Sequence, residues 1–416
     1  MKNTMTLRFL MFAGVLTAIA TAPNTSLAVG YYKFCARWQY QFTDQGLGED
    51  YLKHTAGQSY GRIAAARSYA MVWRDSTAVW GGYMNSSGCT GSIVGNAGTY
   101  LFWIFPEVSS SSNKKISIYP DSNEQWYTWS YSQYRPAVPS GSTVTLWYNL
   151  GGDPISSVAA VATEIINRAV SDTNFLPDKS TPYKIYANQM CPGGASACYT
   201  GGRVYLGTLN GGRAANIKTA IAHEMGHANM DYLMGIPKVD YNHSVPADLT
   251  HCRCDHVSPP EENRLHCLQS REHAYTSQAE GWAHFYAADL FNNPSDSNCW
   301  FAYYKEFLYG VVAPPPVQIN AYADHKWIRT LCSYSSTGSE LDWLTLYWKV
   351  NNKTASAFSF ADLNNVYRKI CGDAKCDSND VPIWNSTLIA VGLIYGTTHP
   401  KFIFWRDTGV AKGTDL

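Results

Sequence analysis

The sequence is poor in charge. Only 15% of its 416 residues are charged, and 32 basic residues balance 32 acidic ones to a net charge of zero. Globular domains usually contain about 25% charged residues. A chain this neutral has no electrostatic footprint for nucleic acid or for an anionic membrane, so neither is an expected partner. The apolar content of 45% is ordinary and sufficient for a sizeable core.

Long apolar runs are scarce as well. The run Phe9–Ala20 follows Lys2 and Arg8 and precedes the small-residue end Ser26–Ala28. It is too short to cross a bilayer, which needs about 20 residues, and the pattern is typical of a secretory signal peptide over residues 1–28. We therefore expect an exported protein, secreted or periplasmic, with no membrane association after signal cleavage.

The 11 cysteines all follow the signal peptide, and in an exported chain they predict disulfides. A second zinc site is an alternative for the cysteines and histidines between residues 251 and 267, although their spacing matches no standard zinc finger. The expected disulfide pairs are Cys35 with Cys89, Cys191 with Cys198, and Cys371 with Cys376.

Residues 29–150 are predicted to form a β-sandwich module. Short segments rich in aromatic and β-branched residues are separated by Gly, Ser, Asn and Asp. A removable propeptide is the alternative role for this part, and the turn-forming stretch Asn149–Pro154 predicts the boundary that ends it. The expected strands are Trp38–Phe42, Ser68–Trp73, Ala78–Tyr83, Thr99–Phe105, Lys115–Tyr119 and Thr143–Tyr148.

The strongest motif is His223-Glu224-Met225-Gly226-His227. Two histidines four positions apart lie on one face of a helix, where both imidazoles reach one Zn²⁺ at about 2.0–2.1 Å. Glu224 can then take a proton from the zinc-bound water. The alternative is an exposed helix that carries these residues by chance.

The segment around the motif predicts a helix. Apolar residues recur at helical spacing across residues 216–233, and Asn216 is the expected N-cap. Gly226 costs about 1 kcal/mol relative to alanine inside a helix. We interpret this glycine as a point where another backbone approaches closely.

A catalytic zinc usually has three protein ligands and one open position. A third histidine six positions after the motif is excluded, because that residue is Leu233. Residues 268–291 predict a long helix in which Glu280 lies among alanines and aromatic residues, and a carboxylate buried there needs a partner such as zinc. Glu272 or His273 is the alternative third ligand. A further alternative is that Glu272, His273 and Glu280 all lie on a solvent-exposed face of the helix and bind no metal.

The order helix, strand, strand, His-Glu-x-x-His helix resembles the upper subdomain of zincins. A helix around Val158–Ala169 and strands at Tyr183–Asn188 and Arg203–Gly207 precede the motif. The run Ala197–Gly207 is similar to thermolysin-like gluzincin metallopeptidases, and Ala279–Ala283 resembles the Glu-helix of that family. Within the first module, residues 66–105 resemble a transthyretin-like fold.

The gluzincin resemblance implies a multidomain α+β chain. An N-terminal β-sandwich would be followed by a zincin domain over residues 151–416. Its upper subdomain, over about 151–235, would contain a mixed sheet and the active-site helix, and its lower subdomain, over about 268–416, would be mainly helical. Amphipathic segments in the lower part are expected helices, and the insert Pro237–Cys267 is expected to rim the cleft. These segments are Trp300–Tyr309, Ser339–Val350 and Phe360–Ile370.

The resemblance also implies roles for individual residues. His223, His227 and Glu280 would bind zinc, Glu224 would be the catalytic base, and an edge strand at Ser196–Tyr199 would bind the substrate backbone.

The sequence departs from the family at one position. Many gluzincins have an aspartate four residues after the ligand glutamate, where this chain has His284, which could act through an imidazole nitrogen. Asp231 is an alternative orienting residue. Tyr286 and His325 are candidates for stabilising the oxyanion.

We therefore expect an exported zinc metallopeptidase, an endopeptidase acting on protein or peptide substrates with one Zn²⁺ per chain. The alternatives are a zinc exopeptidase and a secreted binding or adhesion protein with a vestigial zinc site. The intact Glu224 argues against the last, because a purely structural metal needs no base.

Overall fold

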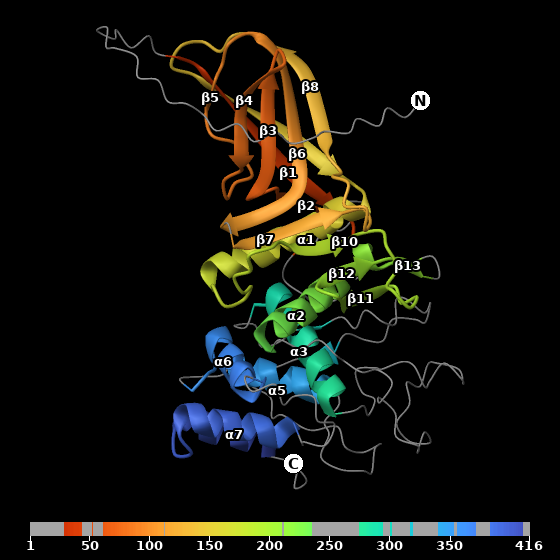
Figure 1. Ribbon diagram of the computed structural model, residues 1–416. Helices are drawn as coiled ribbons and strands as arrows, with labels where there is room; N and C mark the ends of the chain where they lie inside the picture. The colour runs from red at the N-terminus through yellow and green to blue at the C-terminus, as the bar shows by residue number, and fades with distance from the viewer. Residues whose placement is uncertain are drawn as a thin grey trace.

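The computed structural model combines β-sheets and α-helices in one chain (Figure 1). In the described part, α1 lies between strands and six further α-helices follow. The fold is therefore mixed α+β, as expected. The described residues are 29–43, 52, 61–111, 113–209, 212–234, 274–293, 300–301, 317–318, 340–352, 356–371 and 383–410.

The smaller of the two main sheets is built around β1 (Tyr31–Tyr40). This strand pairs in antiparallel fashion with β2 (Gly61–Ala64) and β5 (Ile93–Val94). It also runs parallel to β9 (Thr143–Gly151) along most of its length. Strands from both ends of the N-terminal region therefore meet on β1.

The larger sheet has the order β11-β12-β10-β7-β6-β3-β4 among the described strands, with β8 also paired to β6. Five of its strands precede residue 150: β3 (Ser68–Arg74), β4 (Thr77–Tyr83), β6 (Gly98–Ser111), β7 (Lys114–Tyr119) and β8 (Trp129–Arg135). Three follow it: β10 (Tyr183–Tyr186), β11 (Ala197–Thr200) and β12 (Arg203–Leu206).

The two sheets pack face to face through aromatic side chains. Every second residue of β6 is buried from Gly98 to Val108, which is the period of a strand with one covered face. The ring of Phe34 on β1 lies 5.4 Å from that of Tyr100 and 5.5 Å from that of Phe102 on β6. The predicted strand segments all fall on or overlap strands of these sheets.

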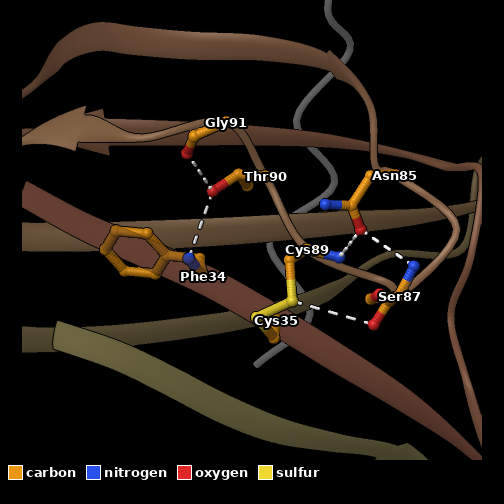
Figure 2. The surroundings of a disulfide bond; sticks show 7 residues. All are labelled: Phe34, Cys35, Asn85, Ser87, Cys89, Thr90 and Gly91. Carbon is orange, nitrogen blue, oxygen red and sulfur yellow. Dashed lines mark hydrogen bonds between the residues drawn. A yellow bond between two sulfur atoms is a disulfide. The ribbon is translucent and has the colours of Figure 1, made fainter. Parts of the chain in front are cut away.

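The predicted disulfide between Cys35 and Cys89 joins β1 to the turn that follows β4 (Figure 2). Around it, Asn85 Oδ1 accepts hydrogen bonds from the backbone N–H groups of Ser87 at 2.9 Å and Cys89 at 3.0 Å. The bridge spans a sequence separation of 54. Closing a loop of that length removes about 4 kcal/mol of chain entropy from the unfolded state.

The larger sheet continues across residue 150, where the sequence predicts a domain boundary. β7 and β10, from either side of that residue, pair in parallel. Buried apolar side chains also form one continuous cluster from the sandwich, with Phe34, to the last helix, with Trp405. The stretch at 149–154, predicted as a linker, instead contains the end of β9, a tight turn at residues 152–153 and the first residue of α1.

Helix α1 (Pro154–Ser171) confirms the predicted helix and packs on strands of both sheets. A capping box starts it: Ser156 N–H donates to Asp153 Oδ1 at 2.8 Å, and Asp153 N–H donates to Ser156 Oγ at 3.2 Å. Trp38 Nε1 donates to Thr163 Oγ1 at 3.1 Å, which attaches the smaller sheet to the helix.

The helices follow the sheet in layers (Figure 1). α2 packs on α1, β11 and β12 and also on α3, while α3 packs on α5 and α5 on α8. None of the helices in the described part is both long and apolar enough to cross a membrane. A hairpin of β13 (Thr208–Leu209) and β14 (Gly212–Arg213) leads to α2 (Lys218–Met234), α3 (Ala274–Phe291), α5 (Glu340–Asn352), α6 (Phe360–Cys371), α7 (Ile383–Tyr395) and α8 (Pro400–Val410).

Two local predictions are wrong. A helix is predicted from Trp300, but Trp300–Phe301 form β15 and pair with β16 (Val317–Gln318), because aromatic residues favour a strand where a partner is available. Asn216 does not cap α2. It ends a 3₁₀ turn, and its carbonyl accepts the N–H of Thr43 at 2.8 Å. Residues 1–28, 237–267 and 302–309 and Cys376, on which further predictions fall, lie outside the described residues.

Candidate metal centre

Helix α2 carries the His-Glu-x-x-His motif, as predicted. His223 and His227 are one turn apart on it, with their Nε2 atoms 3.0 Å from each other. Both side chains belong to buried residues, with 1% and 8% of their surface exposed. The two imidazoles therefore face one point inside the molecule.

Helix α3 provides the third predicted ligand. Glu280 Oε2 lies 2.9 Å from His223 Nε2 and 3.5 Å from His227 Nε2, and Glu280 is fully buried. The three residues form a group compact enough to hold a metal ion. The structure thus brings together the residues that the sequence predicts as ligands, whereas Glu272 and His273 lie outside the described residues.

The chemistry of these donors fits a small divalent ion. Ligand atoms at 2.0–2.1 Å from a tetrahedral zinc are about 3.3 Å from one another. The three separations here lie between 2.9 and 3.5 Å. A buried carboxylate is costly without a compensating positive charge. Two imidazoles and one carboxylate leave the fourth position open, as in catalytic zinc sites.

Gly226 explains how the two helices come so close. A Cβ built on it would lie 2.8 Å from Ala283 Cα and 3.0 Å from Tyr286 Cβ, both on α3. Any side chain at this position would push α3 away from α2. The interpretation of Gly226 as a point of close backbone approach is confirmed.

Burial and charge act differently on the two histidines. Burial lowers the pKa of His223 well below its ordinary value of 6.5, and the adjacent His284 lowers it further. Burial also lowers the pKa of His227, but the nearby carboxylates, Glu280 first, outweigh burial and raise it. His223 is therefore the neutral imidazole that a metal requires. At His227 the carboxylates favour a positive charge, which a metal ion supplies in place of a proton.

Glu224 lies beside the ligands on the same helix. Only 4% of its surface is exposed, and its negative charge is one of those that raise the pKa of His227. With an ion held by the two histidines and Glu280, a carboxylate at this position would be available as a proton acceptor.

His284 contacts His223 through an imidazole nitrogen. The Nδ1 atoms of the two rings are 3.1 Å apart, and His284 Nε2 is 2.9 Å from Glu340 Oε2 at the start of α5. Sequence reasoning missed Glu340. An acidic residue in the first turn of a helix is common and carries no signal of a site.

The other predicted residues take different places. The Tyr199 hydroxyl donates to Asp231, so this acid connects α2 to β11. Tyr286 is fully buried and stacks on Phe175 with ring centroids 4.2 Å apart, which is a core position. His325 and the Cys/His-rich stretch at 251–267 lie outside the described residues.

The strand β11 ends the larger sheet among the described strands and packs on α2. It runs antiparallel to β12, and the predicted disulfide between Cys191 and Cys198 attaches it to the preceding loop. Ala197, Cys198 and Tyr199 are only partly buried, and Thr200 is exposed. The expected edge strand therefore lies next to the helix that carries the motif.

No protein-family model matches the chain, and no curated protein matches its sequence. Its chemistry is therefore inferred from the geometry of the site. The site is a buried group of two histidines and a glutamate that can hold a metal ion.

Proposed function

We propose that the chain is a zinc-dependent metallopeptidase of the gluzincin type. One observation carries the proposal. His223 Nε2, His227 Nε2 and Glu280 Oε2 converge on one point, and Glu224 lies on the same helix as the two histidines. A structural metal site would use four protein ligands and needs no adjacent base.

Zinc is the ion we propose, because a site with two imidazoles, one carboxylate and an open position is a recurrent catalytic zinc site. When bound, zinc would polarise the scissile carbonyl and lower the pKa of water towards about 7. Glu280 would offset one of its two positive charges. His223 and His227 would hold it against α2.

Glu224 would act as the general base. Its carboxylate would accept a proton from the attacking water and then donate that proton to the leaving amine. Its burial restricts bulk water around the carboxylate, which keeps the transferred proton within the site.

The edge strand β11 supports a peptide as substrate. An edge strand has backbone N–H and C=O groups that can pair with an extended chain. A substrate segment alongside Ala197–Thr200 would lie next to α2 and its histidines. Backbone pairing recognises any peptide and requires no chain terminus, which favours an endopeptidase over an exopeptidase.

The arrangement of elements supports the zincin assignment. A helix, a mixed sheet with an edge strand, the motif helix and a second helix with the glutamate follow in that order, and further helices lie beneath. The two disulfides support an exported protein, since such bonds persist in oxidising compartments.

The test replaces Glu224 with Gln, which keeps the size of the side chain and removes the base. We expect casein cleavage to fall at least about 100-fold, because general base catalysis contributes that much, while metal content stays at that of the wild type. Asp407→Asn on α8, an exposed acid far along the chain, is the matched control and should cleave normally. Full activity of Glu224→Gln would refute the base role.

A second comparison separates the three functional readings. Metal-loaded wild type is incubated with casein and with short blocked and unblocked peptides, with and without a chelator. Cleavage of casein and blocked peptides that the chelator abolishes supports the endopeptidase, and cleavage of unblocked peptides alone supports the exopeptidase. Cleavage of no substrate by metal-loaded protein would favour the binding or adhesion protein.

A further inference from the structure

A chain of three buried polar side chains extends from the metal centre into the lower helices. His223 on α2 contacts His284 on α3 through their Nδ1 atoms, 3.1 Å apart. His284 contacts Glu340 on α5 through Nε2 and Oε2, 2.9 Å apart. All three are almost completely excluded from solvent. Buried polar groups of this kind are retained only when their hydrogen bonds are made.

The contacts of His223 determine its tautomer. Its Nε2 faces Glu280 and the Nε2 of His227, which makes Nε2 the atom that binds the ion. A neutral imidazole that binds through Nε2 carries its proton on Nδ1. That proton needs an acceptor, and the atom opposite it is Nδ1 of His284.

The tautomer of His284 then follows. Its Nδ1 accepts from His223, so the proton of the neutral ring is on Nε2. This N–H donates to Glu340 Oε2, a carboxylate oxygen that can only accept. Among neutral tautomers of the two rings, one combination alone satisfies both contacts together with metal binding.

The position of Glu340 is itself held by packing. A Cβ on Gly281 of α3 would lie 2.9 Å from the Glu340 carbonyl oxygen and 2.3 Å from Trp343 Cβ. The first turn of α5 therefore rests directly on the backbone of α3, one turn before His284. The N-terminus of α5 also favours a negative charge at Glu340.

We propose that His284 and Glu340 are positioning residues for the metal centre: Glu340 orients His284, and His284 fixes the tautomer and ring orientation of His223. The inference rests on the proposed function, since it assumes that His223 binds the ion. We call the two contacts His223–His284 and His284–Glu340 the relay. Glu340, which ends the relay, lies on α5, one of the lower helices. Metal binding and the docking of α5 are therefore coupled.

A different reading of the same residues is a second metal ion. Ligand atoms of Glu280, His284 and Glu340 also lie within 4.8 Å of one another. The relay is favoured because each of its two contacts has the length of an N–H hydrogen bond. The proton assignment above also gives each contact one donor and one acceptor. The relay requires one metal ion per chain, and two ions per chain would overturn it.

The experiment measures metal binding, not catalysis. Zinc affinity is determined by competition with a chromophoric chelator, and the visible spectrum is recorded after loading with Co²⁺. We expect His284→Phe and Glu340→Leu each to weaken zinc binding about 10- to 100-fold, as loss of a hydrogen-bond partner behind a ligand does, and to alter the Co²⁺ spectrum. Wild-type affinity and spectrum in both variants would overturn the relay.

Conservative variants keep the proposal testable if those two fail to fold. Glu340→Gln keeps an acceptor oxygen but removes the charge. Its loss of zinc affinity should therefore stay below about 10-fold, and its Co²⁺ spectrum should be closer to that of the wild type than the spectrum of Glu340→Leu is. Asp231→Asn, an acid on α2 that accepts from Tyr199, is the matched control and should not change affinity. Equal losses for Asp231→Asn and Glu340→Gln would indicate a general charge effect and overturn the positioning role.

The outcome also separates this inference from the proposed function. Wild type that binds no divalent ion would overturn both. Wild type that binds one zinc and cleaves casein, together with unaltered zinc binding by His284→Phe and Glu340→Leu, would overturn the relay alone.

Discussion

The two ends of the molecule bury different kinds of side chain. Between the two sheets the buried groups are mainly rings such as Phe34 and Phe102, whereas the apolar core between α2, α3 and α5 also contains the ionisable side chains His223, Glu280 and Glu340. Burial of apolar surface is favourable by about 25 cal/mol per Å² and needs no partner of a given charge. A buried carboxylate or imidazole is stable only with partners that match its charge and protons. The contacts between the sheets are therefore mainly apolar, whereas the polar cluster between α2, α3 and α5 requires partners of matching charge.

The largest expected effect tests the sandwich. Phe102 is fully buried and contacts Phe34 and Tyr148. Phe102→Ala should lower the free energy of unfolding by about 3–5 kcal/mol, through lost burial and a cavity. Denaturant titration of metal-loaded protein measures this loss. Metal content of the folded variant should equal that of the wild type, and a loss of metal would show that the two ends are not separable.

A smaller effect, on both stability and metal binding, is expected at the contact between α2 and α3. Gly226→Ala puts a methyl group 2.8 Å from Ala283 Cα, so overpacking should cost about 1–3 kcal/mol despite the better helix propensity of alanine. The shift also separates the histidines from Glu280, so zinc affinity should fall.

The sheet offers a matched glycine for this test. A Cβ on Gly81 of β4 would have its nearest neighbour, Met71 Cγ, at 3.9 Å. Gly81→Ala should therefore change stability by less than about 0.5 kcal/mol and leave zinc affinity unaltered. Equal effects of the two substitutions would refute the close-approach explanation.

The smallest expected effect is a loss of folding stability at acidic pH. Asp362 in the first turn of α6 is partly buried, which raises its pKa, but hydrogen bonds from Lys401, Tyr395 and Ser359 outweigh this and lower the pKa from 3.8 to about 2. A lowered folded-state pKa means that the carboxylate stabilises the fold above about pH 4. This contribution is lost as the pH falls from about 4 to about 2. Because Asp362 and Lys401 are still partly exposed and water screens their interaction, we expect only about 1 kcal/mol.

The measurement is the difference in unfolding free energy between wild type and Asp362→Asn at several pH values. The difference should be near its full value at pH 5 and should disappear by pH 2. The exposed acid Asp407 on α8 is the control, and Asp407→Asn should differ little from wild type at any pH. A constant difference for Asp362→Asn from pH 5 to pH 2 would contradict the role of its charge.

Local patterns predicted most of the elements and three ligand positions. The alternation around Phe102, the helical spacing after Pro154 and the His-Glu-x-x-His spacing each involve residues close in sequence, where backbone geometry alone relates spacing to direction. Glu280 was predicted from the resemblance of Ala279–Ala283 to the gluzincin Glu-helix, supported by the cost of burying an acid among alanines and aromatics without a partner. Gly226 was informative because glycine destabilises a helix interior, so its presence indicated that a neighbouring backbone lies too close for a side chain.

Other features lay beyond local patterns. Turn-forming residues such as Gly152 and Asp153 occur both between domains and within one domain, so the continuity of the sheet from β7 to β10 could not be predicted. Trp300 was predicted as helical because its strand partner, β16, follows much later in the chain. Pairing partners distant in sequence decided both cases.

The amino-acid sequence by itself determined the disulfide pairs Cys35–Cys89 and Cys191–Cys198, the strands of the sandwich and the spacing of the two histidines. Only the tertiary structure decided that the larger sheet crosses residue 150 and that Glu340 ends a chain of hydrogen bonds behind His223. Spacing within one helix or strand follows from backbone geometry. Contacts between helices far apart in the chain depend on how the whole core packs, which no local pattern contains.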